Sequence, residues 1–402
     1  MHSSFAVLLA AVLILPTLAR AQEAAPSAEE RIKALEARLD KLETAPASAS
    51  QSSFNPAMGL AIDMALESTN GKANFNFRSA ELNVESPIDP YLKGWAVITG
   101  SNGNNPTTNG GTPTIDIEEA TLETTSLPQN FTVRGGRLFA NFGRLAHFHD
   151  HELPFIDRPN SLNTFVGGET RGDGLEVQYL FPIDTYVSAT AGFYDKVGTS
   201  NGRQDVTGTR SLNEFSYLAR VNAYKDIGDN HSLEMGLDSI WTPKRTVADT
   251  TTPAPLGIVT VRDTWRTLTG LDITYRYQPV QGGLYKGVIW GTELMQNNER
   301  RFDGSNLPQR RNHSYSGFSY VELRSGRHLR GGVMADATQD LDNVKLLTKT
   351  GTVFLSYDVT EFQRLRVAYA QAKTNDSRPD NHTIGLQWTG VLGHHVHGFR
   401  DR

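Results

Sequence analysis

The chain has 402 residues, a net charge of −5 at pH 7 and an isoelectric point of about 6.1, so it lacks the basic excess of a nucleic-acid-binding protein. It contains no cysteine, which suits an oxidising compartment. Its length allows two soluble domains or one large barrel. The mean hydropathy of −0.40 does not separate these, because strands of a membrane barrel alternate between lipid-facing and lumen-facing residues.

Residues 1–21 are predicted to be a signal peptide. The apolar run at residues 5–18 is too short to cross a membrane as a helix, and it ends at Ala19-Arg20-Ala21, an A-x-A cleavage pattern. The positively charged start of such peptides is missing, because His2 stands there without Lys or Arg. We expect the mature chain to begin near Gln22. The alternative is a buried helix of a soluble domain.

Residues 22–53 are predicted to form a short N-terminal coiled-coil helix and a linker. Ile32, Leu35, Leu39 and Leu42 recur at spacings of 3, 4 and 3 between charged residues, as in a coiled-coil seam. So short a helix is marginal in isolation, which favours association of several copies. The alternative is a single helix packed on its own chain. Residues 44–53 are small and polar and predict a linker.

Residues 54–402 are predicted to be all-β. Short runs of period two recur along this stretch; for example, Leu365, Val367 and Tyr369 alternate with Arg364 and Arg366. A charged face on strands of about ten residues is typical of a transmembrane barrel, because soluble strands are usually nearer five or six residues. The pattern predicts about sixteen antiparallel strands, at residues 55–67, 72–85, 90–100, 114–126, 130–140, 171–181, 184–195, 212–226, 230–241, 260–277, 283–297, 312–325, 327–337, 344–359, 362–374 and 380–393.

The connections between these strands alternate in length. Every second connection is short, as at residues 86–90, 181–184 and 360–362, whereas most of the others are long and polar. Short periplasmic turns and long extracellular loops are the pattern of bacterial outer-membrane barrels, and an even strand number places both ends of the barrel in the periplasm. Aromatic residues near the strand ends are interpreted as interfacial girdles: Tyr91, Trp95, Phe181, Tyr194, Trp241, Tyr277 and Trp388.

Charged residues on the polar face of the strands are candidates for the lining of a pore, where they would set selectivity. The third outer connection, residues 141–170, is the longest and adds three carboxylates. The alternative is that these charges only pair within the barrel interior. The candidates are Arg134, Arg220, Arg276, Arg364, Arg366, Asp63, Glu176, Glu234, Asp238 and Asp272 in strands, and Asp150, Glu152 and Asp157 in the third loop.

Histidines gather at two places. His147, His149 and His151 would share one face of an extended segment, and with Asp150 or Glu152 nearby they are candidate ligands for zinc or copper. The alternative is hydrogen bonding within a folded loop. A second cluster, His394, His395 and His397, lies near the C-terminus.

Several segments resemble known families. A long third loop resembles that of general bacterial porins, whose third loop folds into the barrel and narrows the pore. A family of uncharacterised porin-like outer-membrane proteins, often labelled zinc-regulated outer-membrane receptors, is similar over most of residues 54–398. The similar segments are Phe54-Asn55-Pro56, Glu118-Glu119-Ala120, Leu127-Pro128, residues 136–144 (GRLFANFGR) and residues 154–159 (PFIDRP).

The resemblance and the strand pattern together predict an outer-membrane channel. We expect a water-filled pore for diffusion of small polar or ionic solutes, narrowed by the third loop, in a homotrimer surrounded by outer-membrane lipid. The alternative is a metal-linked receptor or a plugged, metal-binding barrel, in which zinc would be the cofactor. An actively driven receptor would need a plug domain before a 22-stranded barrel. An enzyme is not expected, since no G-x-S-x-G motif marks a nucleophile.

Overall fold

The computed structural model describes residues 56–101, 114–198, 211–249, 259–283, 285–301 and 310–393. The predicted signal peptide, the predicted coiled coil and the C-terminal histidines lie outside the described residues. No helix within these ranges is long and apolar enough to cross a membrane.

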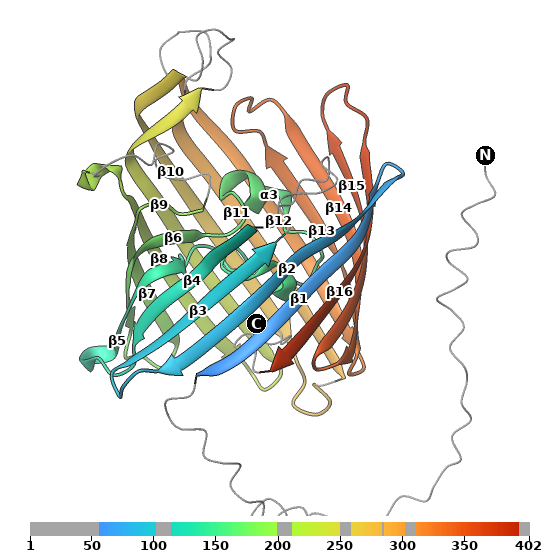
Figure 1. Ribbon diagram of the computed structural model, residues 1–402, viewed down its shortest axis with the longest axis horizontal. Coiled ribbons are helices and arrows are strands. Elements are labelled where there is room, and N and C mark those ends of the chain that lie inside the picture. Colours follow the sequence, from blue (N-terminus) through green and yellow to red (C-terminus); the bar gives the residue numbers. More distant parts are fainter. Residues whose placement is uncertain are drawn as a thin grey trace, which may run out of the picture. The chain divides into compact units, whose positions relative to one another are not determined.

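Sixteen antiparallel strands form one closed barrel, in which each strand pairs with its neighbours in sequence and β1 closes the ring against β16 (Figure 1). The predicted all-β barrel is therefore confirmed. The strands are β1 (Ala57–Thr69), β2 (Lys72–Pro87), β3 (Leu92–Ser101), β4 (Thr114–Thr124), β5 (Phe131–Phe139), β6 (Arg171–Leu180), β7 (Tyr186–Tyr194), β8 (Ser216–Ile227), β9 (His231–Asp249), β10 (Val259–Tyr277), β11 (Lys286–Arg301), β12 (Arg310–Ser325), β13 (Leu329–Gln339), β14 (Leu347–Thr360), β15 (Gln363–Thr374) and β16 (Asn381–Gly393).

The outer face of the wall is apolar. In β14, Val353 and Leu355 are exposed, whereas their neighbours Thr352 and Ser356 point inward and are buried. Leu355 pairs with Val367 of β15, so the apolar side chains continue across the sheet. Such an outer band needs lipid around it, which is the environment of an outer-membrane barrel. The predicted location in the bacterial outer membrane is confirmed at the level of the fold.

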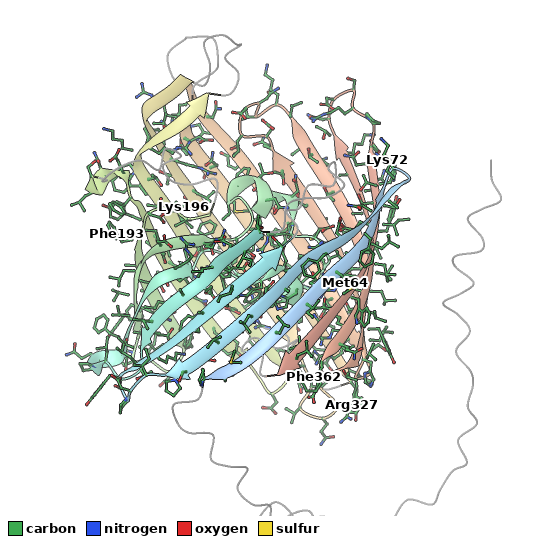
Figure 2. All side chains as sticks on the ribbon, in the orientation of Figure 1. Met64, Lys72, Phe193, Lys196, Arg327 and Phe362 are labelled. Carbon is green, nitrogen blue, oxygen red and sulfur yellow. The ribbon has the colours of Figure 1, made fainter. Side chains whose placement is uncertain are left out.

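The two ends of the barrel differ in their connections. Lys72, at the β1–β2 turn, and Arg327, in the turn between β12 and β13, lie at opposite ends (Figure 2). The end with Arg327 carries short turns, as predicted, and the two-residue β1–β2 turn beside Lys72 is a short turn at the other end. The largest departure from a predicted boundary is in β9, which continues to Asp249 instead of ending near residue 241. Its extension pairs with β10, and an irregular register beside Pro243 accommodates a residue that cannot donate a ladder hydrogen bond.

The interpretation of aromatic girdles is wrong at two positions. Tyr194 is fully buried, and its hydroxyl donates to Glu176 inside the barrel. Trp95 likewise uses its indole N–H for an inward contact with Glu119 at 3.2 Å. Trp241 and Trp388 are half exposed on the wall, as a girdle requires.

Two β-bulges interrupt the alternation near the start of the barrel. Between β1 and β2 the register passes from Asp63–Ser79 to Met64–Phe77, so Arg78 is the extra residue. Between β3 and β4 it passes from Val97–Glu119 to Ile98–Ile117, so Glu118 is the extra residue. A bulge re-aims a side chain that regular pleating would send to the other face. Both bulged side chains reach the segment described next.

Candidate functional site in the barrel lumen

Residues 140–170, called loop 3 here, fold inside the barrel. The loop leaves β5, forms the 3-10 turn η2 (Asp150–Glu152) and the short helix α3 (Asn160–Phe165), and returns to β6. Helix α3 lies within the outline of the barrel (Figure 1) and contacts β11, β12 and β13, which belong to the far wall. Loop 3 therefore crosses the lumen.

An apolar core inside the lumen holds loop 3 against the far wall. The ring of Phe155 packs edge-to-face on Tyr320 and Phe354, with centroid distances of 5.5 and 5.9 Å. Burying a side chain of this size contributes about 1.5–3 kcal/mol. The core joins Phe142, Leu145, Leu153, Phe155, Ile156, Leu162 and Phe165 of the loop to Leu218, Ile240, Leu268, Met295, Phe318 and Phe354 of the wall.

Hydrogen bonds from wall side chains to the loop backbone are spread around the barrel. They satisfy buried N–H and C=O groups that the loop cannot pair within itself. The contacts are Asn141 N to Glu176 (2.7 Å, β6), Leu145 N to Glu293 (2.7 Å, β11), Ser161 N to Asp336 (2.9 Å, β13), Arg266 to Phe165 O (2.7 Å, β10) and Arg366 to Phe155 O (2.8 Å, β15).

Arg158 connects distant parts of loop 3 to one another. Its guanidinium donates to the carbonyl oxygens of Leu145 at 3.1 Å and Phe148 at 2.7 Å, and it pairs with Asp150 at 2.8 Å and Glu169 at 3.4 Å. Burial raises the pKa of Asp150, but Arg158 and Arg78 outweigh burial and hold it below its usual value. The loop thus has a fixed internal geometry.

The bulged Arg78 ties loop 3 to β2. Its guanidinium donates to the carbonyl oxygen of Ile156 at 3.0 Å and pairs with Asp157 at 3.0 Å. On the wall side it pairs with Asp63 at 3.1 Å and Glu67 at 3.4 Å. One arginine therefore joins the carboxylates of the wall to those of the loop.

A cluster of two imidazoles and three carboxylates, called the His–Glu cluster here, lies beside Arg78. Nδ1 of His149 is 3.4 Å from Glu81 of β2 and 3.5 Å from Glu118 of β4, while Nε2 is 3.7 Å from Glu119. Nδ1 of His151 is 3.1 Å from Glu81. All five side chains are buried.

The electrostatics of the His–Glu cluster favour positive charge on the imidazoles. Burial lowers the pKa of His149, but Glu118, Glu119 and Glu81 outweigh it and raise the pKa well above the usual value. Burial also lowers the pKa of His151, and Glu81 reverses the direction and raises it. Glu169 of loop 3 is affected as well. Its burial and, to a smaller extent, the negative charge of Glu118 raise its pKa well above the usual value.

The predicted strand residues lie on the inner face, most of them in ion pairs within the wall. Arg220 contacts Asp238 at 2.5 Å and Asp272 at 2.8 Å. The other contacts are Arg134 with Glu176 (2.5 Å), Arg276 with Glu234 (3.2 Å), Arg364 with Asp358 (2.8 Å), Arg366 with Gln387 (3.0 Å), and Asp63 with Gln387 and Thr389 (2.8 Å each).

The predicted loop residues divide into three groups. Asp150 and Asp157 pair with arginines, as described, and Glu152 accepts the backbone N–H of His149 at 3.1 Å. His149 and His151 are stacked at a centroid distance of 5.7 Å, as expected for one face of a segment. His147 instead meets the ring of Phe148 edge-to-face at 4.8 Å. Among the described residues, the group whose donor atoms lie within 4.8 Å of one another is Glu81, Glu118 and His149, without His147.

Sequence reasoning missed several residues of this site. The pair Glu118-Glu119 carried a signal, because two adjacent buried carboxylates break the alternation and imply a bulge. Glu293 and Arg144 lie in ordinary patterns and gave none. Sequence reasoning found only part of a basic group on β10, β12, β13 and β15. Its members are Arg276, Arg324, Arg330, Arg364 and Arg366, of which Arg276 and Arg324 lie on the wall opposite the His–Glu cluster.

Comparisons with known proteins agree on the architecture. No family model matches the chain. An uncharacterised protein of Aquifex aeolicus is 26% identical in an alignment 366 residues long, which covers 81% of this chain and 70% of that protein. Among solved structures, OprB of Pseudomonas putida has a TM-score of 0.57 at 11% identity and covers 88% of this chain and 97% of its own.

Two further solved structures have the same fold. An anion-selective porin from Comamonas acidovorans has a TM-score of 0.56 at 11% identity and covers 84% of this chain and 99% of its own. The outer membrane channel DcaP of Acinetobacter baumannii has a TM-score of 0.56 at 13% identity and covers 84% and 97%. At this identity the likeness shows the porin-like barrel fold.

Proposed function

We propose that the chain forms a diffusion channel of the outer membrane for small polar or ionic solutes, with loop 3 as its constriction. The observation that carries the proposal is the course of loop 3, which enters a closed 16-strand barrel and is fixed to the wall on several sides. A segment held in this way reduces the cross-section of the lumen at a defined height. The fold shared with porins and channels supports the same function, and we propose no enzymatic role.

The charges beside loop 3 support passage of charged or polar solutes. The carboxylates of β2 and β4 stand about eight strands around the ring from the arginines of β10 and β12, that is, on opposite walls. A transverse field between acidic and basic walls orders polar solutes in a narrow pore. Of the predicted residues, Arg276 is the partly exposed arginine of the basic wall, beside Arg324 and Arg330.

Single-channel conductance of the refolded protein in a planar bilayer tests this function. Stepwise conductance is expected. A variant in which residues 150–164 are replaced by a short Gly-Ser linker should conduct more, because the constriction is removed. Folded barrels without conductance in both proteins would refute the channel, and equal conductance in both would refute the constriction.

Charge variants test the contribution of the basic wall. Replacing Arg324 and Arg330 by alanine should shift the reversal potential in a salt gradient towards cations, because two positive charges leave the lumen. Arg327→Ala, in the exposed turn, is the matched control and should leave the reversal potential unchanged.

We also propose that the channel assembles as a homotrimer. OmpT of Vibrio cholerae, which has been solved in a trimer form, is similar in fold with a TM-score of 0.54 at 10% identity. The coiled-coil pattern of residues 22–53 also favours association of several copies. Chemical cross-linking in detergent should give a trimer band. A monomer that retains residues 22–53 would contradict this assembly. The alternative of a metal-linked receptor gains no support from the comparisons.

A further inference from the structure

The junction between loop 3 and strands β2–β4 is a buried cluster of groups that ligate metal ions. We propose that Glu81, Glu118 and His149 bind one divalent transition-metal cation of the zinc class. His151 is placed to act as a fourth ligand or to orient Glu81, which its Nδ1 approaches at 3.1 Å. This site differs from one built of three loop histidines, because two of its ligands come from the barrel wall.

Two of the distances between the proposed ligand atoms match the edges of a coordination tetrahedron. Ligand atoms about 2.0–2.1 Å from zinc in tetrahedral geometry are separated from one another by roughly 3.3 Å. Nδ1 of His149 lies 3.4 Å from Glu81 and 3.5 Å from Glu118. The three donor atoms all lie within 4.8 Å of one another.

The residues around the proposed ligands hold them in position, as metal ligands require. Glu119 faces Nε2 of His149, the ring nitrogen opposite the proposed metal, at 3.7 Å. A carboxylate in this position fixes the tautomer and raises the basicity of a ligating imidazole. The hydroxyl of Thr99 donates to Glu118, and that of Ser79 donates to Glu81 at 2.8 Å. The indole of Trp95 holds Glu119 at 3.2 Å.

The charge balance of the cluster calls for a cation. Glu81, Glu118 and Glu119 are each less than a tenth exposed, and buried carboxylates are costly unless positive charge compensates them. Arg78 and Arg158 pair with other carboxylates, and Arg134, whose charge acts on Glu119, pairs with Glu176. The positive charge therefore comes from protons on the imidazoles or from a bound metal ion.

The bulge between β3 and β4 turns Glu118 inward beside Glu119. Regular pleating turns only one of two adjacent residues inward, yet Glu118 and Glu119 are both buried. The bulge places one carboxylate on each side of the His149 ring. A metal ion here would fasten loop 3 to the wall and set the height of the constriction.

Direct zinc binding by the full mature chain in detergent is the test. His394, His395 and His397 are replaced by alanine in every protein, so that zinc bound by the tail does not contribute. Zinc is titrated against a chromophoric chelator, and binding of Co²⁺ is followed by its visible absorption. Heat-modifiable migration on gels establishes that each barrel is folded.

We expect one zinc ion per chain in the parent protein. His149→Ala and Glu118→Gln should abolish stoichiometric binding, and Glu119→Gln should weaken it about 10–100-fold, as for other residues that orient a ligand. His147→Ala is the matched control and should bind as the parent does. No stoichiometric zinc in the folded parent, or loss of zinc in His147→Ala, would overturn the proposal.

X-ray absorption of the zinc-loaded parent keeps the test decisive if the variants do not fold. Two carboxylates with one or two imidazoles are expected around the metal. A shell of three imidazoles would overturn the proposed ligand set. Neither result depends on whether the barrel conducts, so failure of the metal site and failure of the channel are distinguishable.

Discussion

Two parts of the inner wall carry buried charges but use them differently. On β8, β9 and β10 the strands are regular around Arg220, and this arginine lies directly across from Asp238 in the ladder. Asp272 completes the group from the next strand, and the absence of a side chain at Gly236 gives the guanidinium its space. The one guanidinium contacts both carboxylates, and all three side chains come from the wall itself.

Strands β1, β2 and β4 differ because bulges break their alternation. Arg78 and Glu118 are the extra residues, and both reach out of the sheet to loop 3. Glu118 meets an imidazole only when the loop is in place, and Arg78, which also pairs with Asp63 and Glu67 of the wall, then reaches the loop carboxylate Asp157. The regular wall therefore stabilises the barrel itself, whereas the bulged wall stabilises one position of a loop inside it. Variants on the two walls should differ accordingly.

The largest effect is expected from Arg220→Ala on the regular wall. Removing the guanidinium leaves Asp238 and Asp272 buried without a cation, and breaking a buried ion pair of this kind costs about 3–5 kcal/mol. The free energy of unfolding in urea, measured in detergent, should fall by that amount. Lys72→Ala, at an exposed turn, is the control and should change it by less than about 0.5 kcal/mol. A small effect of Arg220→Ala would mean that the pair is not desolvated.

A smaller loss of stability, with a larger effect on conductance, is expected from Arg78→Ala on the bulged wall. Asp63 keeps hydrogen bonds from Gln387 and Thr389 at 2.8 Å, so the wall loses about 1–3 kcal/mol. Loop 3, however, loses its contacts at Ile156 and Asp157. Single-channel recordings should show a higher or less steady conductance than the parent. Conductance like that of the parent would show that the apolar core alone holds the loop.

The strands could be predicted from the sequence because their signal is local. Alternation such as that of Leu365, Val367 and Tyr369 arises from the pleat itself and needs no knowledge of distant residues. The strand number, the short turns and the inward face of the charged residues all follow from it. The same signal misplaced Tyr194, because an aromatic residue at a strand end fits a girdle or an interior hydrogen bond equally well.

The interior of the barrel could not be predicted because its contacts are long-range. Glu293 receives the backbone N–H of Leu145 from 148 residues away, and nothing near either residue indicates this. The histidines of loop 3 were recognised as candidate ligands, but their partners Glu81 and Glu118 come from strands read as ordinary wall. A bulge shifts the alternation of inward and outward residues by one position. A search for alternation within short runs of residues does not detect such a shift.

The smallest effect is expected for the contact between Arg78 and Asp157. Measuring it separates the contacts that Arg78 makes with loop 3 from those that it makes with the wall. The side chain of Asp157 is 58% exposed, so water screens the pair, whereas Asp63 is 1% exposed. A double-mutant cycle of Arg78→Ala with Asp157→Asn should give a coupling of about 0.2–1 kcal/mol, the range of exposed ion pairs. The matched cycle with Asp63→Asn should give a larger coupling, because both partners are buried. Equal couplings would mean that Arg78 stabilises loop 3 and the wall to the same extent. The contrast between the regular wall and the bulged wall would then not hold for Arg78.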